Sequence, residues 1–440
     1  MGLFPGGIHP HEGKNGKAVN GGNAAVTLAA PARVVMPMGM HIGAPAKALV
    51  KKGDRVLMGQ KIGEAGGFVS APVHASVSGK VVAVEPCVLA NGAETTAVVI
   101  ENDFADEWVE LHPSDHPETL SAKELVDIVR EAGIVGMGGA CFPTSVKMTI
   151  APDKKADYLI VNGAECEPYL TADHRLMLEH SAEIMDGIRL TMLALDIPKA
   201  IVGIENNKPD AIAAMNAVKA DNVEVRALPV RYPQGGEKQL IYATTRRVVP
   251  AGGLPLDAGC VVDNVGTMKA VHDAVREGKP LIERYTTVGG LVNNPGNFIV
   301  RIGTPISALL DACGGMQPEA KKLINGGPMM GMAMNRPETP VTKGTSGVLA
   351  LGDEAMEPEE SACIRCGRCV RACPMNLFPA KMDGAIRMNL FNVAEKAGVM
   401  NCIECGACTF VCPAKRKLTQ SFRTGKKVIT TRRKAAAAKK

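Results

Sequence analysis

Short apolar runs separated by turn residues occupy the first part of the chain. The runs cover residues 48–50, 56–58, 73–77 and 81–84. Turn-forming pairs lie between them, including Gly53-Asp54 and Ser78-Gly79. Short apolar runs bounded by such pairs are typical of strands in β-sandwiches and barrels. The pattern therefore predicts an all-β domain over residues 1–115.

The pattern then changes to an alternation of helices and strands. Helical spacing is found at residues 121–132, 172–195 and 209–218, and buried-type strands at 157–162, 200–204 and 223–228. Ser121, with Glu124 three positions later, predicts a capped start for the first helix. Because strands that alternate with helices form parallel sheets, we expect residues 116–275 to fold as an α/β domain.

A hairpin pattern follows the α/β region. Apolar runs at 286–292 and 297–301 flank a turn at 293–296, and a short helical run at 305–312 comes next. This order predicts a small β-grasp-like module over residues 284–335.

The last part of the chain is expected to be helical. An acidic stretch at 353–360 is interpreted as a linker, and residues 379–396 have helical spacing. We therefore expect an α-helical domain over residues 355–425, which makes the whole chain a multidomain α/β protein.

Length and composition are compatible with this division. The chain has 440 residues, of which 46% are hydrophobic, and a formal net charge of +5. No apolar run approaches the ~20 residues needed to cross a bilayer, and no signal peptide is recognisable, so we expect a soluble or peripheral protein. The modest charge gives no indication of nucleic-acid binding.

The positive charge is concentrated at the C-terminus. Residues 415–440 include many Lys and Arg and no Asp or Glu. One interpretation of residues 426–440 is a disordered, solubilising tail. The alternative is a basic segment that contacts an anionic membrane face or an acidic partner.

Eight of the 13 cysteines fall into two copies of one motif. Each copy reads C-x2-C-x2-C-x3-C-P, and every cysteine recurs 39 residues later. The copies are Cys363, Cys366, Cys369 and Cys373, and then Cys402, Cys405, Cys408 and Cys412. This is the spacing by which two-cluster ferredoxins hold two [4Fe-4S] clusters.

Two other uses of cysteine fit this motif less well. Structural zinc sites use C-x2-C pairs separated by a longer loop, whereas here the third and fourth cysteines follow at once. Disulfides would require an oxidising compartment and are typical of small secreted domains. The motif therefore predicts electron transfer through iron–sulfur clusters.

In ferredoxins with this motif, the fourth cysteine of each run binds the other cluster. One predicted set of metal ligands is therefore Cys363, Cys366, Cys369 and Cys412. The other predicted set is Cys402, Cys405, Cys408 and Cys373.

A glycine-rich segment at residues 133–147 is the second candidate site. It contains Gly136, Gly138 and Gly139 and ends at Lys147. It differs from the dinucleotide fingerprint, because a helix precedes it and Cys141 takes the position of the third glycine. Clustered glycines still let backbone N–H groups approach a phosphate closely, and Lys147 adds positive charge. The loop either binds a nucleotide phosphate or is an ordinary glycine-rich loop.

The β-rich region resembles biotinyl/lipoyl-type sandwich domains. Residues 51–60 and 70–82 carry the resemblance. That family modifies a lysine at a hairpin tip, whereas the tip here, residues 64–68, has none. The resemblance implies a docking or structural role for this domain.

Four segments resemble the flavin-binding subunits of respiratory complex I and related hydrogenases. They are residues 133–147, 161–168, 232–237 and 262–267. That family also has a β-grasp (SLBB) module followed by a helical cluster domain, in the order expected here. The resemblance implies a Rossmann-like α/β domain that binds FMN and NAD(H). One departure is Cys141, which stands where a glycine is usual before Phe142-Pro143.

Within this superfamily, the chain is identified as a member of the RnfC (RsxC) family. These proteins belong to membrane-bound ferredoxin:NAD oxidoreductases that translocate ions. The opening segment 6–14, the N-terminal barrel-sandwich, the glycine loop, residues 162–168 and the cysteine motifs carry the resemblance.

The resemblance implies a role for eleven further residues. Gly136, Gly138, Gly139 and Lys147 are expected to hold the FMN phosphate. Asn162, Glu165, Asp263 and Asn264 are expected to contact the flavin. Phe142, Glu167 and Glu237 are expected to shape the NAD(H) pocket. No side chain is expected to act as a catalytic nucleophile, because the cofactors supply the chemistry.

The family also implies the setting of the reaction. NAD(H) would exchange electrons with FMN and two [4Fe-4S] clusters, and the clusters with other subunits. The expected partners are integral membrane subunits and a ferredoxin-like subunit, on the cytoplasmic face of the membrane. The alternatives are a soluble NADH-dependent flavin reductase of the cobalamin-reductase or hydrogenase type, and a cluster-only wire without an NAD site.

Overall fold

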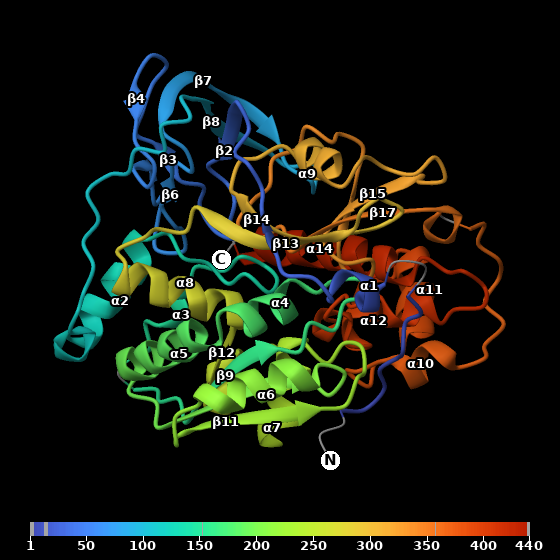
Figure 1. Cartoon of the computed structure of the whole chain (residues 1–440). Coiled ribbons are helices and arrows are strands. Elements are labelled where there is room, and N and C mark those ends of the chain that lie inside the picture. The colour runs from blue at the N-terminus through green and yellow to red at the C-terminus, as the bar shows by residue number, and fades with distance from the viewer. Residues whose placement is uncertain (1–3, 13–15, 152, 357, 438–440) are drawn as a thin grey trace.

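A computed structural model describes residues 4–12, 16–151, 153–356 and 358–437. Figure 1 shows the N-terminal strands in blue, the α/β region in green, a sheet in yellow and orange across the middle, and a red helical region. Among the described residues, no helix is long and apolar enough to span a bilayer.

Two small antiparallel sheets form the N-terminal region. One has the order β2-β8-β7-β4 and the other β3-β5-β6. Their strands are β2 (Arg33–Pro37), β3 (Lys47–Ala48), β4 (Arg55–Val56), β5 (Lys61–Glu64), β6 (Val73–His74), β7 (Gly79–Val88) and β8 (Glu94–Asn102). A short helix, α1 (Lys17–Asn20), precedes them. The predicted barrel-sandwich architecture is confirmed, with strands shorter than most of the apolar runs.

A parallel four-stranded sheet forms the centre of the α/β region. Its order is β11-β10-β9-β12, with β9 (Tyr158–Gly163), β10 (Lys199–Glu205), β11 (Val223–Leu228) and β12 (Cys260–Asn264). The helices are α2 (Ala122–Glu131), α3 (Thr144–Lys147), α4 (Ala172–Glu179), α5 (Ser181–Leu195), α6 (Pro209–Val218), α7 (Glu237–Thr245) and α8 (Val265–Arg276). The predicted capping box of α2 is present, with Ser121 and Glu124 bonded reciprocally.

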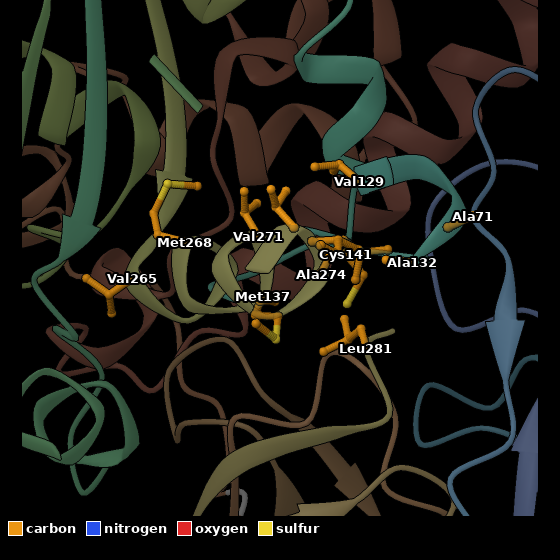
Figure 2. Close-up of a cluster of buried hydrophobic side chains, with 14 of the residues drawn as sticks. Ala71, Val129, Ala132, Met137, Cys141, Val265, Met268, Val271, Ala274 and Leu281 are labelled. Carbon is orange, nitrogen blue, oxygen red and sulfur yellow. The ribbon is translucent and has the colours of Figure 1, made fainter. Parts of the chain in front are cut away.

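Alternating residues of β9 build two cores on opposite faces of this sheet. Leu159 and Val161 join the core that includes α5 and α8. Ile160 packs on the other face with Leu240 and Ile241 of α7. Figure 2 shows the first core where it reaches the glycine loop, with Met137 and Cys141 beside residues of α8. The loop is therefore anchored by packing beneath it.

The sequence predicts one helix over residues 172–195, and this prediction is wrong. The structure has two helices, α4 and α5, that meet at His180. The His180 ring bonds Glu183 through Nδ1 (2.9 Å) and the Tyr285 hydroxyl through Nε2 (2.9 Å). Because these contacts fix His180 in a non-helical conformation, the break is made by tertiary structure.

A six-stranded sheet connects distant parts of the chain. Its order is β1-β14-β13-β17-β15-β16, with β1 (Val26–Thr27), β13 (Glu283–Gly290), β14 (Gly296–Arg301), β15 (Lys322–Asn325), β16 (Met332–Met334) and β17 (Gly347–Leu351). The predicted hairpin is present as β13 and β14, and α9 (Ile306–Ala312) follows. Strands β1 and β17 lie outside the predicted module 284–335, so the sheet is larger than that range.

The last region is helical. It contains α10 (Arg368–Ala372), α11 (Pro379–Arg387), α12 (Phe391–Lys396), α13 (Ala407–Phe410) and α14 (Leu418–Ala437). The expectation of a disordered basic tail is wrong for residues 426–437, because α14 includes them. Phe422 and Ile429 of α14 are buried against α11 and α12. The remaining tail residues, 438–440, lie outside the described residues.

One buried lysine joins three of these regions. The Lys343 ammonium group donates to the carbonyl of Pro72 in the N-terminal region (2.7 Å) and to that of Gly133 before the glycine loop (2.6 Å). Its own carbonyl accepts from the buried Arg284 of β13. Burial lowers the pKa of Lys343 to about 7.

Candidate functional site

The candidate flavin site lies at the carboxyl edge of the parallel sheet. Strand β9 has β10 on one side and β12 on the other. The connections that leave the sheet therefore diverge there, and open α/β sheets bind ligands at such a point. Asn162 near the end of β9 and Asn264 at the end of β12 are paired in register. The predicted residues Asn162, Asp263 and Asn264 are thus brought together.

The glycine loop follows α2 and covers this edge. Gly136 N–H donates to Phe142 O (2.9 Å), which closes the loop, and Met137 N–H donates to the Thr267 hydroxyl of α8 (3.0 Å). A Cβ on Gly138 would lie 2.9 Å from Nδ2 of Asn264, so the loop can approach β12 this closely only with glycine there.

The tip of the loop is open. Gly138, Gly139 and Ala140 are exposed, and a Cβ on Gly139 would meet nothing within 4 Å. Within the described part of the chain, their backbone N–H groups have no hydrogen-bond acceptor. Free amides at an open glycine loop are suited to an anionic group such as a phosphate.

Lys147 lies beneath the loop beside two acids. Its Nζ donates to Val262 O (2.8 Å) and lies 3.4 Å from Oδ1 of Asp263, whose side chain is buried. Burial raises the pKa of Asp263, and Lys147 opposes this shift. Burial also raises the pKa of Glu237, while Lys147 lowers it. The loop base, Lys147, Asp263 and Glu237 are therefore one electrostatic unit.

Two asparagines hold the surrounding loops together. Asn162 Nδ2 donates to Gly235 O (2.9 Å), which ties β9 to the segment before α7. Asn264 caps α8 by accepting from Gly266 N–H (2.8 Å), and its Nδ2 donates to Asp173 (2.7 Å). Both amide groups are already used within the protein, so they fix the walls of the site.

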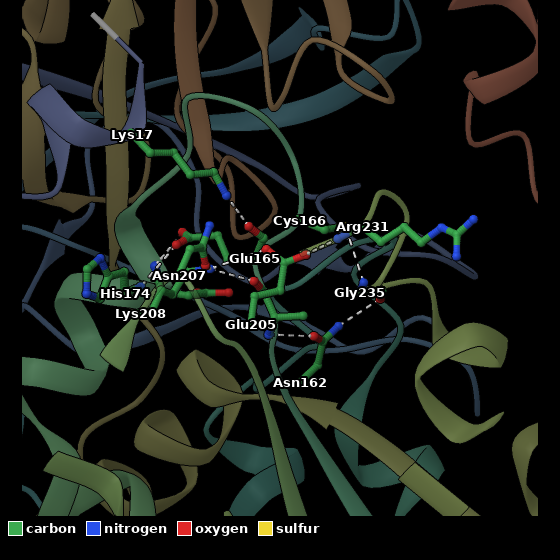
Figure 3. Close-up of polar contacts among 12 residues, drawn as sticks. Lys17, Asn162, Glu165, Cys166, His174, Glu205, Asn207, Lys208, Arg231 and Gly235 are labelled. Atoms are coloured by element: carbon green, nitrogen blue, oxygen red, sulfur yellow. Dashed lines mark hydrogen bonds and ion pairs between the residues drawn. The ribbon is translucent and has the colours of Figure 1, made fainter. Parts of the chain in front are cut away.

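Figure 3 shows that Glu165 lies in a network of buried charges. Its carboxylate accepts from the N–H groups of Asp173 (2.7 Å) and His174 (3.1 Å) at the start of α4. Burial and then the charge of Asp173 raise its pKa. Lys17 of α1 donates to the Glu165 carbonyl. The carboxylate oxygens of Glu165 therefore hold helix α4.

Glu167 lies on the side of the site that faces the helical region. Its carboxylate accepts from Met329 N–H (2.9 Å), and Tyr232 OH lies at 3.5 Å from its other oxygen. Burial raises the pKa of Glu167 to about 7. Phe142 is half-buried beside the loop tip. The structure thus places Phe142 and Glu237 near the glycine loop and Glu167 at a domain interface.

The residues present fit FMN, the group that the sequence implies. Asp263 Oδ2 and both polar atoms of the Gln234 amide are buried without a partner among the described residues. Orphaned buried polar atoms beside an open loop of free amides are expected where a polar ligand completes the site. The donors suit a phosphate, and the buried polar groups suit a heterocycle.

The cysteines fall into the two sets expected from the motif. Burial raises the pKa of Cys369, and the nearby Cys412 and Cys363 thiols raise it further. Cys402 and Cys405 likewise act on each other and on Cys373. A small cavity is lined by the four cysteines of this set, Cys373, Cys402, Cys405 and Cys408. The fourth cysteine of each motif therefore lies with the first cysteines of the other.

The second set fits a [4Fe-4S] cluster. Burial raises the pKa of the Cys405 thiol to about 12, so the apo form disfavours the thiolates that iron would stabilise. Two amides already point at sulfur, because Leu377 N–H donates to Cys373 (3.3 Å) and Glu404 N–H to Cys402 (3.4 Å). Such bonds to ligand sulfur help to set the potential of a cluster.

This second cysteine set contacts the flavin region directly. Tyr232 OH donates to the carbonyl of Cys405 (2.7 Å). Gln239 Nε2 in α7 donates to Pro374 O, next to Cys373, at 3.4 Å. Ile8 pairs with Tyr232 through two backbone bonds of 2.9 Å.

Several site residues could not be assigned from the sequence. They include Lys17, Lys208, Tyr232, Gln234 and Gln239. Tyr232 and Gln234 lie in the segment 232–237 that carried the resemblance, so that motif could have indicated them. Lys17 comes from a distant segment, and only the fold brings it here.

Four families match successive parts of the chain. The RnfC barrel sandwich hybrid domain matches residues 3–105, and the Nuo51 FMN-binding domain matches 129–273. The SLBB domain matches residues 285–333, and a 4Fe-4S dicluster domain matches 355–413. The predicted fold classes and the FMN and [4Fe-4S] cofactors are thereby confirmed.

Three relatives, each the RnfC-type component of its complex, are similar over nearly the whole chain. That of the proton-translocating ferredoxin:NAD(+) oxidoreductase complex of Clostridium ljungdahlii is 50% identical over 96% of this chain and 92% of its own length. That of the Na(+)-translocating complex of Acetobacterium woodii is 47% identical over 98% of each chain. That of the ion-translocating oxidoreductase complex of Rhodobacter capsulatus is 44% identical over 97% of this chain and 83% of its own.

Solved structures include an NAD+-reducing [NiFe]-hydrogenase in its H2-reduced state. It aligns with 72% of this chain and 62% of its own, at 19% identity and a TM-score of 0.49.

Proposed function

Because this chain belongs to the RnfC family, whose members are components of ion-translocating ferredoxin:NAD(+) oxidoreductase complexes, we propose that it passes electrons between NAD(H) and one-electron carriers in such a complex. The contact between the flavin region and the second cysteine set, made by Tyr232 OH on Cys405 O, is the observation that carries the proposal. It joins a two-electron site to a one-electron site within one chain.

In the flavin region, the protein binds and orients the cofactor. FMN, when bound, exchanges a hydride with NAD(H) and single electrons with iron–sulfur clusters. Gly136, Gly138 and Gly139 provide an open loop for its phosphate, with Lys147 beneath as the compensating charge. Asp263 offers a buried, unpaired oxygen to a polar edge of the ligand. Asn162 and Asn264 fix the walls through Gly235 and α8.

The acidic loop positions the site from outside. Glu165 holds the start of α4, and the buried Lys208 donates to Ala164 O (2.8 Å) in the same loop. We assign Glu165 to this positioning role, in place of the direct flavin contact implied by the resemblance. Phe142 and Glu237 border the open loop on the side where the nicotinamide nucleotide would enter, and Glu167 borders the clusters.

The two cysteine sets are arranged in series. The set of Cys373, Cys402, Cys405 and Cys408 contacts the flavin region, and three of its members are buried. In the other set, Cys363 and Cys366 are exposed. Electrons would pass between the flavin and the surface through the inner and then the outer cluster.

The partners follow from the family. The chain is one component of a multi-subunit, ion-translocating complex. We propose that it lies at the cytoplasmic face of the membrane, against integral membrane subunits and a ferredoxin-like subunit.

The test is anaerobic purification of the full chain, followed by reconstitution with FMN, iron and sulfide. We expect one FMN and two [4Fe-4S] clusters, bleaching of the flavin absorbance by NADH, and then reduction of the clusters. Intact clusters without FMN binding would leave only a cluster wire. Flavin reduction in a chain that does not co-purify with integral membrane subunits would instead support a soluble reductase.

A further inference from the structure

The two cysteine motifs share one backbone conformation. The residue before the second cysteine is left-handed in both, with φ 57° at Arg365 and 58° at Glu404. The glycine after that cysteine is also left-handed, with φ 72° at Gly367 and 78° at Gly406. Because the backbones correspond position by position, differences between the side chains of the two motifs are not needed to form the loop.

The surroundings of the two motifs are opposite. Ile403 in the second motif packs against a buried cluster that includes Tyr232 and Cys405. The corresponding residue of the first motif, Ile364, is 68% exposed. Val370 and Phe378, which follow in the chain, are also exposed. The first motif therefore presents apolar side chains to solvent next to its two exposed cysteines.

Charge also distinguishes the motifs. The first has Arg365, Arg368 and Arg371 where the second has Glu404, Ala407 and Phe410. Between residues 361 and 381 the chain has no Asp or Glu. Since the second motif forms the same loop without these arginines, they are not required by the fold.

The pairing of arginines in the helical region sets these three apart. Most of the others have an acidic partner: Arg387 and Arg416 pair with Asp383, Arg423 with Glu404, and Arg433 with Glu395. Arg432 instead lies over the Phe391 ring. By contrast, no carboxylate pairs with Arg365, Arg368 or Arg371 in the part of the chain that the structure describes. Arg371 only donates to Cys366 O, at 3.5 Å, beside a cluster ligand.

We propose that this surface docks an acidic one-electron carrier protein of the ferredoxin type. We call it the arginine face, and it comprises Ile364, Arg365, Arg368, Val370, Arg371 and Phe378. Exposed apolar side chains with a charged rim are typical of transient protein interfaces. Unpaired positive charge beside the exposed cluster favours a partner whose own surface is acidic. Figure 1 shows α10, which carries three of these residues, at the outer margin of the helical region.

The inference rests on the proposed function, and its electron count follows from it. The carrier gains one electron as the cluster of Cys363, Cys366, Cys369 and Cys412 loses one. Two such encounters match the two electrons of one hydride from NADH. In the opposite direction, two reduced carriers supply the electrons for one NAD+.

The experiment compares the reconstituted full chain with a double variant, Arg365→Glu with Arg368→Glu. The matched control is Lys52→Glu with Lys219→Glu, two exposed lysines in other regions that undergo the same change of charge. Binding of an acidic two-cluster ferredoxin is measured at low and high ionic strength. We expect the arginine variant to weaken binding by about tenfold or more and to flatten its salt dependence, because rim charges steer association. The control should change it by less than about twofold.

Two further readouts separate the outcomes. NADH should bleach the flavin equally in all three proteins; if the wild-type flavin is not bleached, the proposed function fails rather than the docking site. Equal ferredoxin affinity in the arginine variant and the wild type would overturn the inference. So would unchanged ferredoxin binding combined with a loss of binding to phosphatidylglycerol vesicles, which would assign the arginine face to the membrane.

Discussion

Gly138 is the residue at which the glycine loop comes closest to strand β12. In Gly138→Ala, the new Cβ would lie 2.9 Å from Nδ2 and 3.0 Å from Cβ of Asn264. Overpacking of this kind costs about 1–3 kcal/mol. We expect the loop to shift and FMN affinity to fall by about tenfold, measured by flavin fluorescence titration of the apo-flavin chain. Gly22→Ala, at a position with no atom within 4 Å of the added carbon, should bind FMN normally.

Glu167 is expected to make stability depend on pH. Its pKa is about 7 in the folded chain, mainly through burial, against about 4.3 for an exposed Glu. The folded state therefore holds a proton that the unfolded chain has released. The free energy of unfolding should fall by a few kcal/mol as pH rises from about 4.5 to 7.

The substitution Glu167→Gln should remove this dependence. Its urea midpoint should approach or exceed that of the wild type at pH 8 and lose its advantage at pH 5. Glu319→Gln, at an exposed acid, provides the comparison and should follow the wild type. A wild-type midpoint that changes between pH 5 and 7 no more than that of Glu167→Gln would contradict the assignment.

At the scale of elements, helix α14 shows that the basic C-terminal segment has a structural role. Leu418, Phe422, Gly425 and Ile429 are buried positions of this helix, with the i, i+4, i+7, i+11 spacing of one helix face. Ile429→Ala should destabilise the helical region by about 2–5 kcal/mol. The rate of iron loss to a chelator should rise accordingly, whereas Thr430→Ala, at an exposed position, should leave it unchanged. Equal rates for both variants would mean that α14 does not support the clusters.

The buried spacing of α14 was visible in the sequence, but the run of Lys, Arg and Ala residues outweighed it. The break at His180 was not visible, because it depends on Tyr285, a residue of another region. The strands of the parallel sheet were predicted to within a residue or two, since their apolar runs are fully buried. The cysteine motifs were the most informative, because the chemistry of a cluster fixes their spacing.

At the scale of the whole molecule, the way in which the regions meet could not be predicted from the sequence. Val26 of β1 pairs with Phe298 of β14, far along the chain. Tyr232 joins the flavin and helical regions only because the fold brings Cys405 to it. Such contacts depend on three-dimensional complementarity, which local propensity does not encode.

The Tyr232 contact can be tested across the whole molecule. Tyr232→Phe removes the hydroxyl and leaves the buried carbonyl of Cys405 without this donor, which costs about 1–3 kcal/mol. NADH should still bleach the flavin at the normal rate, while the following reduction of the clusters should slow several-fold in stopped-flow absorbance. Tyr242→Phe, whose hydroxyl lies elsewhere on α7, should behave as the wild type. Slowed flavin bleaching in Tyr232→Phe would instead place Tyr232 in the flavin pocket.

The Lys343 ammonium group has a consequence for the timing of electron transfer. It bonds the N-terminal region at Pro72 and the start of the glycine loop at Gly133, while its backbone belongs to the segment that leads into β17. Three regions clamped at one point have little freedom to swing against one another, so the spacing of the redox centres is built in. A viscous solvent should therefore slow the arrival of the carrier and leave the rate of internal electron transfer unchanged.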